Sequence, residues 1–305
     1  MIVCATDETR GKDGIETSTS RAFLARPAFL AHDWGFRVQI HATAIVHPKA
    51  NLADDVEVGP FCLIGEHVTI GPGTRLVSHV TVDGWTEIGA RCVLHPFASI
   101  GAPPQHLNYK GEPTKVVIGD DNVLREYVTV NRATAQGGGK TTIGSNNFLM
   151  AYVHVAHDCH LGSHLILANA ASLAGHITIG DHAIIGGLTG IHQYVRVGSY
   201  SMVGGCCALG QDLPPFTRAA GGYRARMYGL NSVGLRRQGF SADRISVLKR
   251  AYDILFRSGH RIPEAAKLAK VEFGDQPDVM TVLAFLEDTK RGICRSVGKD
   301  QEDEE

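Results

Sequence analysis

The chain has 305 residues, of which 44% are hydrophobic and 20% are charged, and its formal net charge is -1 at pH 7. This composition can bury a large core, the near-neutral charge gives no global attraction to nucleic acid, and no apolar run approaches the length of a membrane span. Seven cysteines without a Cys-x-x-Cys pair argue against a disulfide framework or a zinc ribbon and favour reduced thiols in the cytoplasm.

The first 37 residues are polar and lie outside any repeat, so we expect a disordered extension over residues 1–37. A secretory signal needs an unbroken apolar stretch, and Arg26 and Pro27 interrupt the only candidate. Early acidic residues, among them Asp7 and Glu8, count against an organelle transit peptide.

From Ile40 to Leu209, an aliphatic residue recurs at every sixth position, apart from His106 and Glu112 and a shift of phase by one between Val130 and Ile143. This period fits neither the 3.6-residue repeat of a helix nor the long alternation of a flat sheet. It predicts an all-β solenoid, a parallel β-helix of hexapeptide repeats in which each short strand points one aliphatic side chain into a common core.

Three hexapeptides make a triangular coil of 18 residues, so residues i and i+18 should stack about 4.8 Å apart. Glycine follows many of the inward aliphatic residues, as at Gly59, Gly144 and Gly186, and we expect these glycines to let the backbone turn sharply at each corner. The β-helix domain is expected over residues 38–215, because the Pro214-Pro215 pair ends the repeat.

Two segments interrupt the coils. Residues 101–117 are rich in proline, and residues 131–142 contain three consecutive glycines. Loops that project from a rigid scaffold often carry binding residues, so both are candidates for the functional site.

A helical domain is expected over residues 216–295, followed by a solvated acidic tail over residues 296–305. Apolar spacing of three and four predicts a helix with Ser241 as its N-cap and Gly259 just past its end. Pro263 and Pro277 suit the first turns of a second and a third helix, the third ending near Arg291. Residues 217–257 hold nine Lys or Arg against two acids, a patch that could steer an acidic protein partner.

The 18-residue stacking also predicts a candidate site. His157, Gly175 and Gln193 should form one column, which places an imidazole beside an exposed glycine backbone and a carboxamide. Such a trio can hold a hydroxyl, a thioester carbonyl and a sugar together. A metal site built from His154, His157 and His160 is disfavoured, because the His-x4-His pair of the gamma-class carbonic anhydrases is absent.

One segment carries a specific resemblance. Residues 151–176 (AYVHVAHDCHLGSHLILANAASLAGH), together with YKGEPT, AQGGGKTTIGSNNFLM, AIIGGLTGIHQY, QDLPP and the helical C-terminus, closely resemble the UDP-N-acetylglucosamine O-acyltransferases of lipid A biosynthesis. The resemblance runs from about residue 40 to 292. It implies a left-handed β-helix, although crossovers between parallel strands are usually right-handed. It also implies a cytoplasmic homotrimer with active sites between neighbouring solenoids, and we expect no cofactor and no metal.

The resemblance further implies transfer of a 3-hydroxyacyl group from acyl carrier protein to the 3-hydroxyl of UDP-N-acetylglucosamine. By motif matching, His157 is the general base, Asp158 orients it, and the N–H of Gly175 is the oxyanion donor. The remaining matches are the substrate-binding residues Gln105, His154, His176, His192 and Gln193, the uridine- and phosphate-binding Asn231 and Arg237, and the acyl-chain ruler residues Gly187 and Gly205.

Three residues depart from the family pattern on the acceptor side. His106 stands where aspartate is common, Asn108 where lysine is common, and Gln238 where a second arginine is common. N-acylation of the 3-amino analogue of the sugar nucleotide therefore stays open. Two functions of different classes stay open as well, a non-catalytic β-helix scaffold and a zinc-dependent hydratase, although the retained His157 column speaks against the scaffold.

Overall fold

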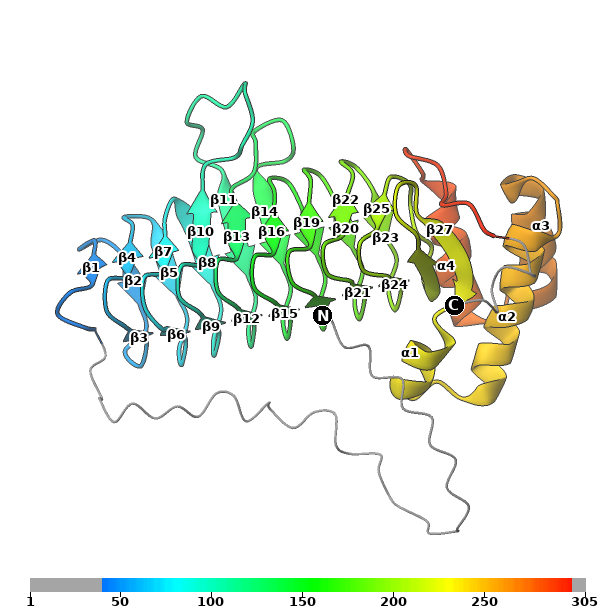
Figure 1. Cartoon of the computed structure of the whole chain (residues 1–305), viewed down its shortest axis with the longest axis horizontal. Coiled ribbons are helices and arrows are strands. Elements are labelled where there is room, and N and C mark those ends of the chain that lie inside the picture. The colour runs from blue at the N-terminus through cyan, green and yellow to red at the C-terminus, as the bar shows by residue number, and fades with distance from the viewer. Residues whose placement is uncertain (1–39, 298–305) are drawn as a thin grey trace, which may run out of the picture. The chain divides into compact units, whose positions relative to one another are not determined.

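The computed structural model describes residues 40–297. The expected extension over residues 1–37, and the acidic tail beyond residue 297, lie outside the described residues. Within them, the chain winds through coils of three short strands and ends in a group of helices (Figure 1). No helix of this part is long and apolar enough to cross a bilayer, and no disulfide joins its cysteines.

From β1 to β25, every third strand pairs in the same sheet, which gives three sheets in the described residues. The first sheet contains β1 (Ile45–Val46), β4 (Leu63–Ile64), β7 (Thr81–Val82), β10 (Ser99–Ala102), β13 (Thr129–Asn131), β16 (His154–Val155), β19 (Ser172–Leu173), β22 (Gly190–Ile191) and β25 (Ala208–Leu209). The second contains β2 (Asn51–Leu52), β5 (Val68–Ile70), β8 (Trp85–Ile88), β11 (Lys115–Ile118), β14 (Lys140–Ile143), β17 (His160–Leu161), β20 (Thr178–Ile179) and β23 (Arg196–Val197). The third contains β3 (Glu57–Val58), β6 (Arg75–Leu76), β9 (Val93–Leu94), β12 (Val123–Leu124), β15 (Phe148–Leu149), β18 (Ile166–Leu167), β21 (Ile184–Ile185), β24 (Met202–Val203), β26 (Thr217–Ala220) and β27 (Arg226–Leu230).

The register confirms the 18-residue coil. Val155 pairs with Leu173, Leu173 with Ile191, and Ile191 with Leu209. Between Ile40 and Leu209 the spacing departs from 18 only across the two predicted excursions, where Ile100 pairs with Val130 and Val130 pairs with Val155. Both excursions leave the scaffold as loops, one between β10 and β11 and the other between β13 and β14 (Figure 1).

The core is the predicted stack of inward aliphatic side chains. Leu149, Leu167, Ile185 and Val203, one from each of four successive coils of the third sheet, have no exposed surface. Burial weakens toward the N-terminal end, where Ile40 is 47% exposed because the described chain places no coil beyond it. The hydrophobic effect therefore acts along the whole solenoid axis rather than at one centre.

The glycines that follow the inward residues do not make the corner turns, so that expectation was wrong. After Gly59, Gly144 and Gly186, the left-handed backbone conformation falls two residues later, on Phe61 (φ 58), Asn146 (φ 60) and Leu188 (φ 56). A Cβ at Gly59 would lie 1.8 Å from the carbonyl oxygen of Val77, and one at Gly186 would lie 2.4 Å from the amide nitrogen of Gly205. These glycines are needed because successive coils approach too closely for a side chain.

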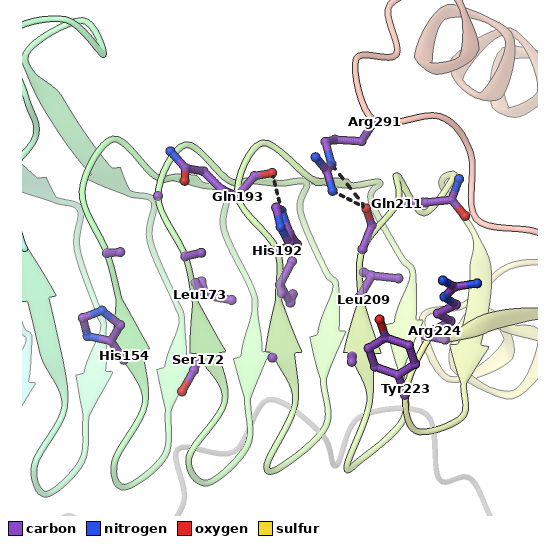
Figure 2. A pocket seen from close by; sticks show the side chains of 18 of the residues that line it. His154, Ser172, Leu173, His192, Gln193, Leu209, Gln211, Tyr223, Arg224 and Arg291 are labelled. Carbon is purple, nitrogen blue, oxygen red and sulfur yellow. Dashed lines mark hydrogen bonds between the residues drawn. The ribbon is translucent and has the colours of Figure 1, made fainter. Parts of the chain in front are cut away.

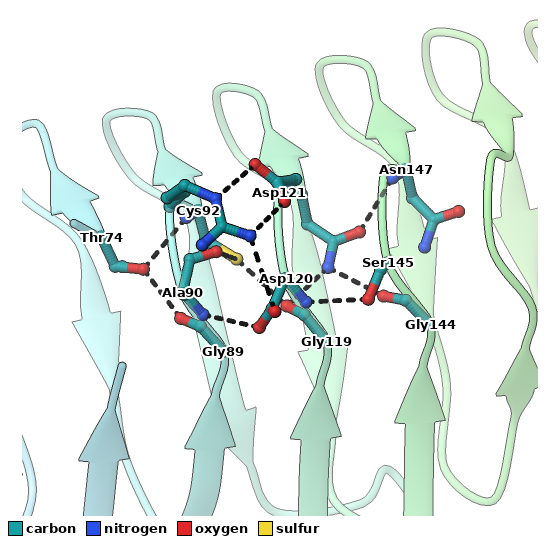
Figure 3. A network of polar contacts seen from close by, with 12 residues as sticks. Thr74, Gly89, Ala90, Cys92, Gly119, Asp120, Asp121, Gly144, Ser145 and Asn147 are labelled. Carbon is teal, nitrogen blue, oxygen red and sulfur yellow. Dashed lines mark hydrogen bonds and ion pairs between the residues drawn. The ribbon is translucent and has the colours of Figure 1, made fainter. Parts of the chain in front are cut away.

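Polar side chains link the coils at one corner (Figure 3). The amide of Ala90 donates to Asp120 Oδ1 at 2.8 Å, and the amide of Asp120 donates to Ser145 Oγ at 2.9 Å. The amide of Asn147 donates in the same way to Asn122 Oδ1, at 2.9 Å. Each side chain satisfies a backbone donor that the corner leaves outside the strand ladder.

Beyond Pro215 the chain closes the solenoid and then forms helices. β26 continues the third sheet in parallel with β24, and β27 returns antiparallel to β26. The helices are α1 (Ser232–Arg237), α2 (Ala242–Arg257), α3 (Ile262–Phe273) and α4 (Pro277–Glu287).

The expected helix starts are confirmed. Ser241 caps α2 by accepting from the amide of Arg244, and Pro263 and Pro277 lie in the first turns of α3 and α4. α4 ends at Glu287 rather than near Arg291, because the following residues extend back onto the solenoid. There the amide of Cys294 donates to the carbonyl of Asp212 at 2.8 Å.

Candidate active site

A pocket of about 970 Å³ runs along the first sheet, from the coil of β16 to the segment that precedes β27. Figure 2 shows His154 at one end and Tyr223, Arg224 and Arg291 at the other. The wall also contains Ser172, which sequence reasoning had not singled out. Six residues expected in the site line the pocket, namely Gln105, His154, His157, Gly175, His192 and Gln193.

His157 and Asp158 form a buried pair. Nδ1 of His157 lies 2.8 Å from Oδ2 of Asp158, and the two residues are 6% and 1% exposed. Neighbouring residues of a strand point to opposite faces, so a contact between them needs a bend. Asp158 occupies the left-handed corner position (φ 60), which turns its carboxylate back to the imidazole. With Nδ1 engaged, Nε2 is the nitrogen left for a substrate.

The second excursion holds the Asp158 carboxylate in place. The amide of Thr134 donates to Oδ1 at 3.0 Å, and the hydroxyl of Thr134 donates to Oδ2 at 2.8 Å. A Cβ at Gly137 would lie 2.1 Å from Cγ of Asp158, so glycine is required for the loop to reach the carboxylate. Sequence reasoning missed both residues, although the run of three glycines that begins at Gly137 was a visible signal.

Gly175 lies directly beneath the imidazole, as the 18-residue column predicts. A Cβ there would be 2.5 Å from Cε1 of His157 and 2.9 Å from Nε2. Among the described residues, the N–H of Gly175 has no hydrogen-bond acceptor. An unused donor therefore lies beside the nitrogen that faces the pocket, which is the arrangement needed to stabilise a developing oxyanion.

Other imidazoles surround this pair. His106 and His176 lie edge to face with His157, with ring centroids 5.3 Å and 5.2 Å away. His176 also stacks on Tyr194 and is not part of the pocket wall. Burial lowers the pKa of His154 and of His176, and for His176 the Asp158 carboxylate partly opposes that effect. Both rings are thereby favoured in their neutral form.

The donor atoms of His157, Asp158 and His176 lie within 4.8 Å of one another, close enough to share a metal ion. The Asp158 carboxylate, however, already accepts hydrogen bonds from Thr134 and His157. The disfavoured metal set is not assembled, because His160 belongs to the second sheet and contacts Thr142 instead. The cluster is better described as a hydrogen-bond relay.

Four expected site residues lie away from this pocket. Asn231 caps α1 and donates to the carbonyl of Tyr200 at 2.9 Å, at the corner between the second and third sheets. Arg237 is exposed in the last turn of α1. Gly187 and Gly205 stack at the corner between the third and first sheets, where a Cβ on Gly205 would lie 3.3 Å from the carbonyl oxygen of Gly187. His157 lies at the remaining corner, between the first and second sheets.

The comparisons with known proteins agree with one another. Residues 212–294 match a family model described as UDP N-acetylglucosamine O-acyltransferase, domain 2. The acyl-[acyl-carrier-protein]–UDP-N-acetylglucosamine O-acyltransferases of Thermodesulfovibrio yellowstonii and Halorhodospira halophila are 54% and 49% identical to the chain over 257 residues, covering 84% of it and 99% of each relative.

Solved structures give the same result. LpxA from Acinetobacter baumannii superposes with a TM-score of 0.83 at 44% identity, covering 85% of this chain and 100% of that one. The UDP-N-acetylglucosamine acyltransferase of Campylobacter jejuni superposes with a TM-score of 0.80 at 40% identity, with the same coverage. These matches confirm the expected left-handed parallel β-helix with a C-terminal helical region.

The partly buried His154 should make folding stability depend on pH. Burial holds its pKa below the ordinary value of 6.5 in the folded chain, so the unfolded chain binds the proton first as pH falls. Its stabilising effect is present above about pH 6.5 and is lost as pH falls toward the folded pKa. The urea midpoint should fall between about pH 7.5 and 5.5, and it should fall less in His154→Gln. A control substitution at the exposed His260 should keep the full decrease, and an equal decrease in His154→Gln would contradict this origin.

Proposed function

The chain belongs to the acyl-[acyl-carrier-protein]–UDP-N-acetylglucosamine O-acyltransferase family, and we propose that His157 is its general base. The enzyme moves an acyl group from acyl carrier protein to UDP-N-acetylglucosamine, the first step of lipid A biosynthesis. The observation that carries the residue assignment is the His157–Asp158 pair above the unused N–H of Gly175. Membership in this family favours O-acylation over N-acylation, the scaffold and the hydratase.

In the proposed reaction, Nε2 of His157 takes the proton of the sugar 3-hydroxyl as its oxygen attacks the thioester carbonyl of a 3-hydroxyacyl donor. Asp158 keeps the imidazole oriented through Nδ1 and stabilises its positive charge. The N–H of Gly175 donates to the oxyanion. When the carbon–sulfur bond breaks, the carrier thiolate leaves and recovers the proton from His157.

The pocket also supplies groups for substrate binding. Gln105, His154, His192 and Gln193 line it and are proposed to contact the sugar or the acyl carbonyl. His176 is proposed to act on Asp158 from behind, since its Nε2 lies 3.6 Å from Oδ2. The donor and acceptor both belong to cytoplasmic metabolism, so we place the enzyme there, with the basic patch of residues 217–257 attracting the acidic carrier protein.

We propose that the enzyme is a homotrimer because one chain separates its own site residues. Asn231 and Arg237 lie at a different corner of the solenoid from His157. If a neighbouring chain supplies them, one surface patch must meet a different patch on the next copy. Such a site between chains can form in closed assemblies of more than one size, and the trimer among them is the assembly that the family resemblance implies.

The proposed acyl-chain ruler is the glycine corner opposite the base. Gly187 and Gln193 are six residues apart on one coil, so roughly 15–20 Å of extended backbone separates the two edges of the first sheet. An extended acyl chain of about twelve to fourteen carbons has a similar length. Gly205 leaves room for its end, which favours the longer class of donors.

Replacing His157 with alanine should lower kcat by roughly 10² to 10⁴, the usual loss when a general base is removed. Steady-state kinetics with a 3-hydroxyacyl carrier protein and UDP-N-acetylglucosamine measures the effect. His160→Ala is the matched control, because His160 is exposed on the second sheet, and it should stay near wild type. Near-normal turnover of His157→Ala would show that the base is misassigned.

Mixing two defective chains should restore activity if the site lies between subunits. His157→Ala and Arg237→Ala should each be poorly active alone at low acceptor concentration. In randomly mixed trimers about a quarter of the sites would combine an intact His157 with an intact Arg237 from the next chain. Coexpressed and purified mixtures should therefore recover up to about a quarter of wild-type turnover. Recovery of none would mean that one chain supplies both residues.

Gly205→Met should shift the donor preference to shorter acyl chains. The methionine side chain would occupy the space of about three methylenes, each worth about 0.8 kcal/mol when buried, so the longest donor should lose roughly 2 kcal/mol of transition-state stabilisation. A panel of 3-hydroxyacyl carrier proteins ranked by kcat/KM measures the shift. The same ranking in both enzymes would remove Gly205 from the ruler.

A further inference from the structure

The end of the pocket farthest from His157 carries unbalanced positive charge. Its wall contains four guanidinium groups, and the complete wall contains no aspartate or glutamate; the four are Arg224, Arg226, Arg291 and Arg295. Arg291 donates to the carbonyl of Gly210, and no carboxylate within the described residues pairs with any of the four. A pocket wall with four cations and no acid favours an anionic ligand.

The backbone fixes where these arginines stand. The amide of Met227 donates to the carbonyl of Arg295 at 2.8 Å, and the amide of Val297 donates to the carbonyl of Met227 at 3.0 Å. The final segment thus lies beside β27, which brings Arg295 next to Arg226. Residues 212 and 294 are joined in the same way, so Arg291 is held at the edge of the last coil. The cluster is part of the end of the solenoid.

The distance between the arginine cluster and His157 limits which phosphate group of a substrate can bind to the arginines. Tyr223 bridges to Ala208, which pairs with Gly190, and Gly190 pairs with Ser172. Three strand spacings, or about 14 Å, therefore separate the row of Gly175 from the row of Arg224 and Arg226, and the row of His157 is about 19 Å away. The ligand phosphate must lie at that distance from the reacting carbonyl. Arg291 lies closer, because it donates to Gly210 in the last coil, two spacings or about 10 Å from the row of Gly175.

Two substrates of the proposed function carry phosphate. In the sugar nucleotide, five to seven bonds separate the 3-oxygen from the two phosphorus atoms, or about 6–8 Å at about 1.2 Å per bond. In the donor, the acyl group is carried on a pantetheine arm, and about fourteen bonds separate the thioester carbon from the phosphodiester, or about 17 Å. Only the donor arm is long enough to reach Arg224, Arg226 and Arg295.

We propose that Arg224, Arg226, Arg291 and Arg295 bind the phosphate of the carrier's phosphopantetheine arm. The assignment rests on the proposed function, because it needs the acyl group to sit at His157. It makes the pocket a channel for the arm, with the thioester at one end and the phosphate at the other. Guanidinium groups suit this task because their paired N–H donors match phosphate oxygens.

The test compares two small donors, 3-hydroxyacyl-phosphopantetheine and the same thioester of pantetheine without phosphate. Wild type should prefer the phosphorylated donor at least tenfold in kcat/KM, since a charge-assisted hydrogen bond is worth about a factor of ten or more. Arg226→Gln combined with Arg295→Gln should bring this preference close to one. Its turnover of the unphosphorylated donor and its KM for UDP-N-acetylglucosamine should stay within about twofold of wild type.

Arg261→Gln combined with Lys267→Gln is the charge-matched control, because both residues are exposed outside the pocket, and it should keep the wild-type preference. An unchanged preference in the Arg226 and Arg295 double variant would overturn the assignment, as would no preference in wild type. A raised acceptor KM with the donor preference intact would assign the cluster to the diphosphate instead. No turnover of any donor by wild type, carrier-bound donors included, would overturn the proposed function itself and this assignment with it.

Discussion

Hydrogen bonding between parallel strands sets the geometry on which the rest of the structure depends. Because each coil takes 18 residues and stacks about 4.8 Å on the next, side chains far apart in sequence fall into fixed columns. His157 and Gly175 come together in this way, with no flexible loop between them. The same close stacking removes side chains where coils meet, as at Gly59 and Gly186.

Features encoded by local spacing could be predicted from the sequence. The inward aliphatic residues, the 18-residue coil and the column of His157 and Gly175 all follow from one period, which repeats often enough to exclude other folds. The helix starts at Ser241 and Pro263 follow from capping chemistry within a few residues. These features could be predicted because they depend either on a repeated pattern or on residues that are close together in the sequence.

Contacts between segments without a shared period could not be predicted. The bonds from Thr134 to Asp158 depend on how a single irregular loop folds back. The return of residues 291–297 to β27 depends on tertiary pairing, and it alone brings Arg295 to the pocket. The resemblance identified Asn231 and Arg237, but only the structure shows that they stand at a different corner from His157. The expected role of the glycines was wrong for a similar reason, because spacing in the sequence does not distinguish a turn of the backbone from a close approach of two coils.

The loop that holds Asp158 lies outside the hydrogen-bonded strands of the coils. The residues that stabilise the fold therefore differ from those that support the candidate site. The strands on either side of the loop, β13 and β14, each pair with the coils before and after them without using residues 133–138. A substitution at Thr134 would therefore remove hydrogen bonds from Asp158, the proposed orienting carboxylate, while the strands of the scaffold stayed paired. The residues that pair the strands and the residue that supports the proposed catalytic pair are thus separate, so a substitution in this loop can alter the chemistry while the solenoid keeps its fold.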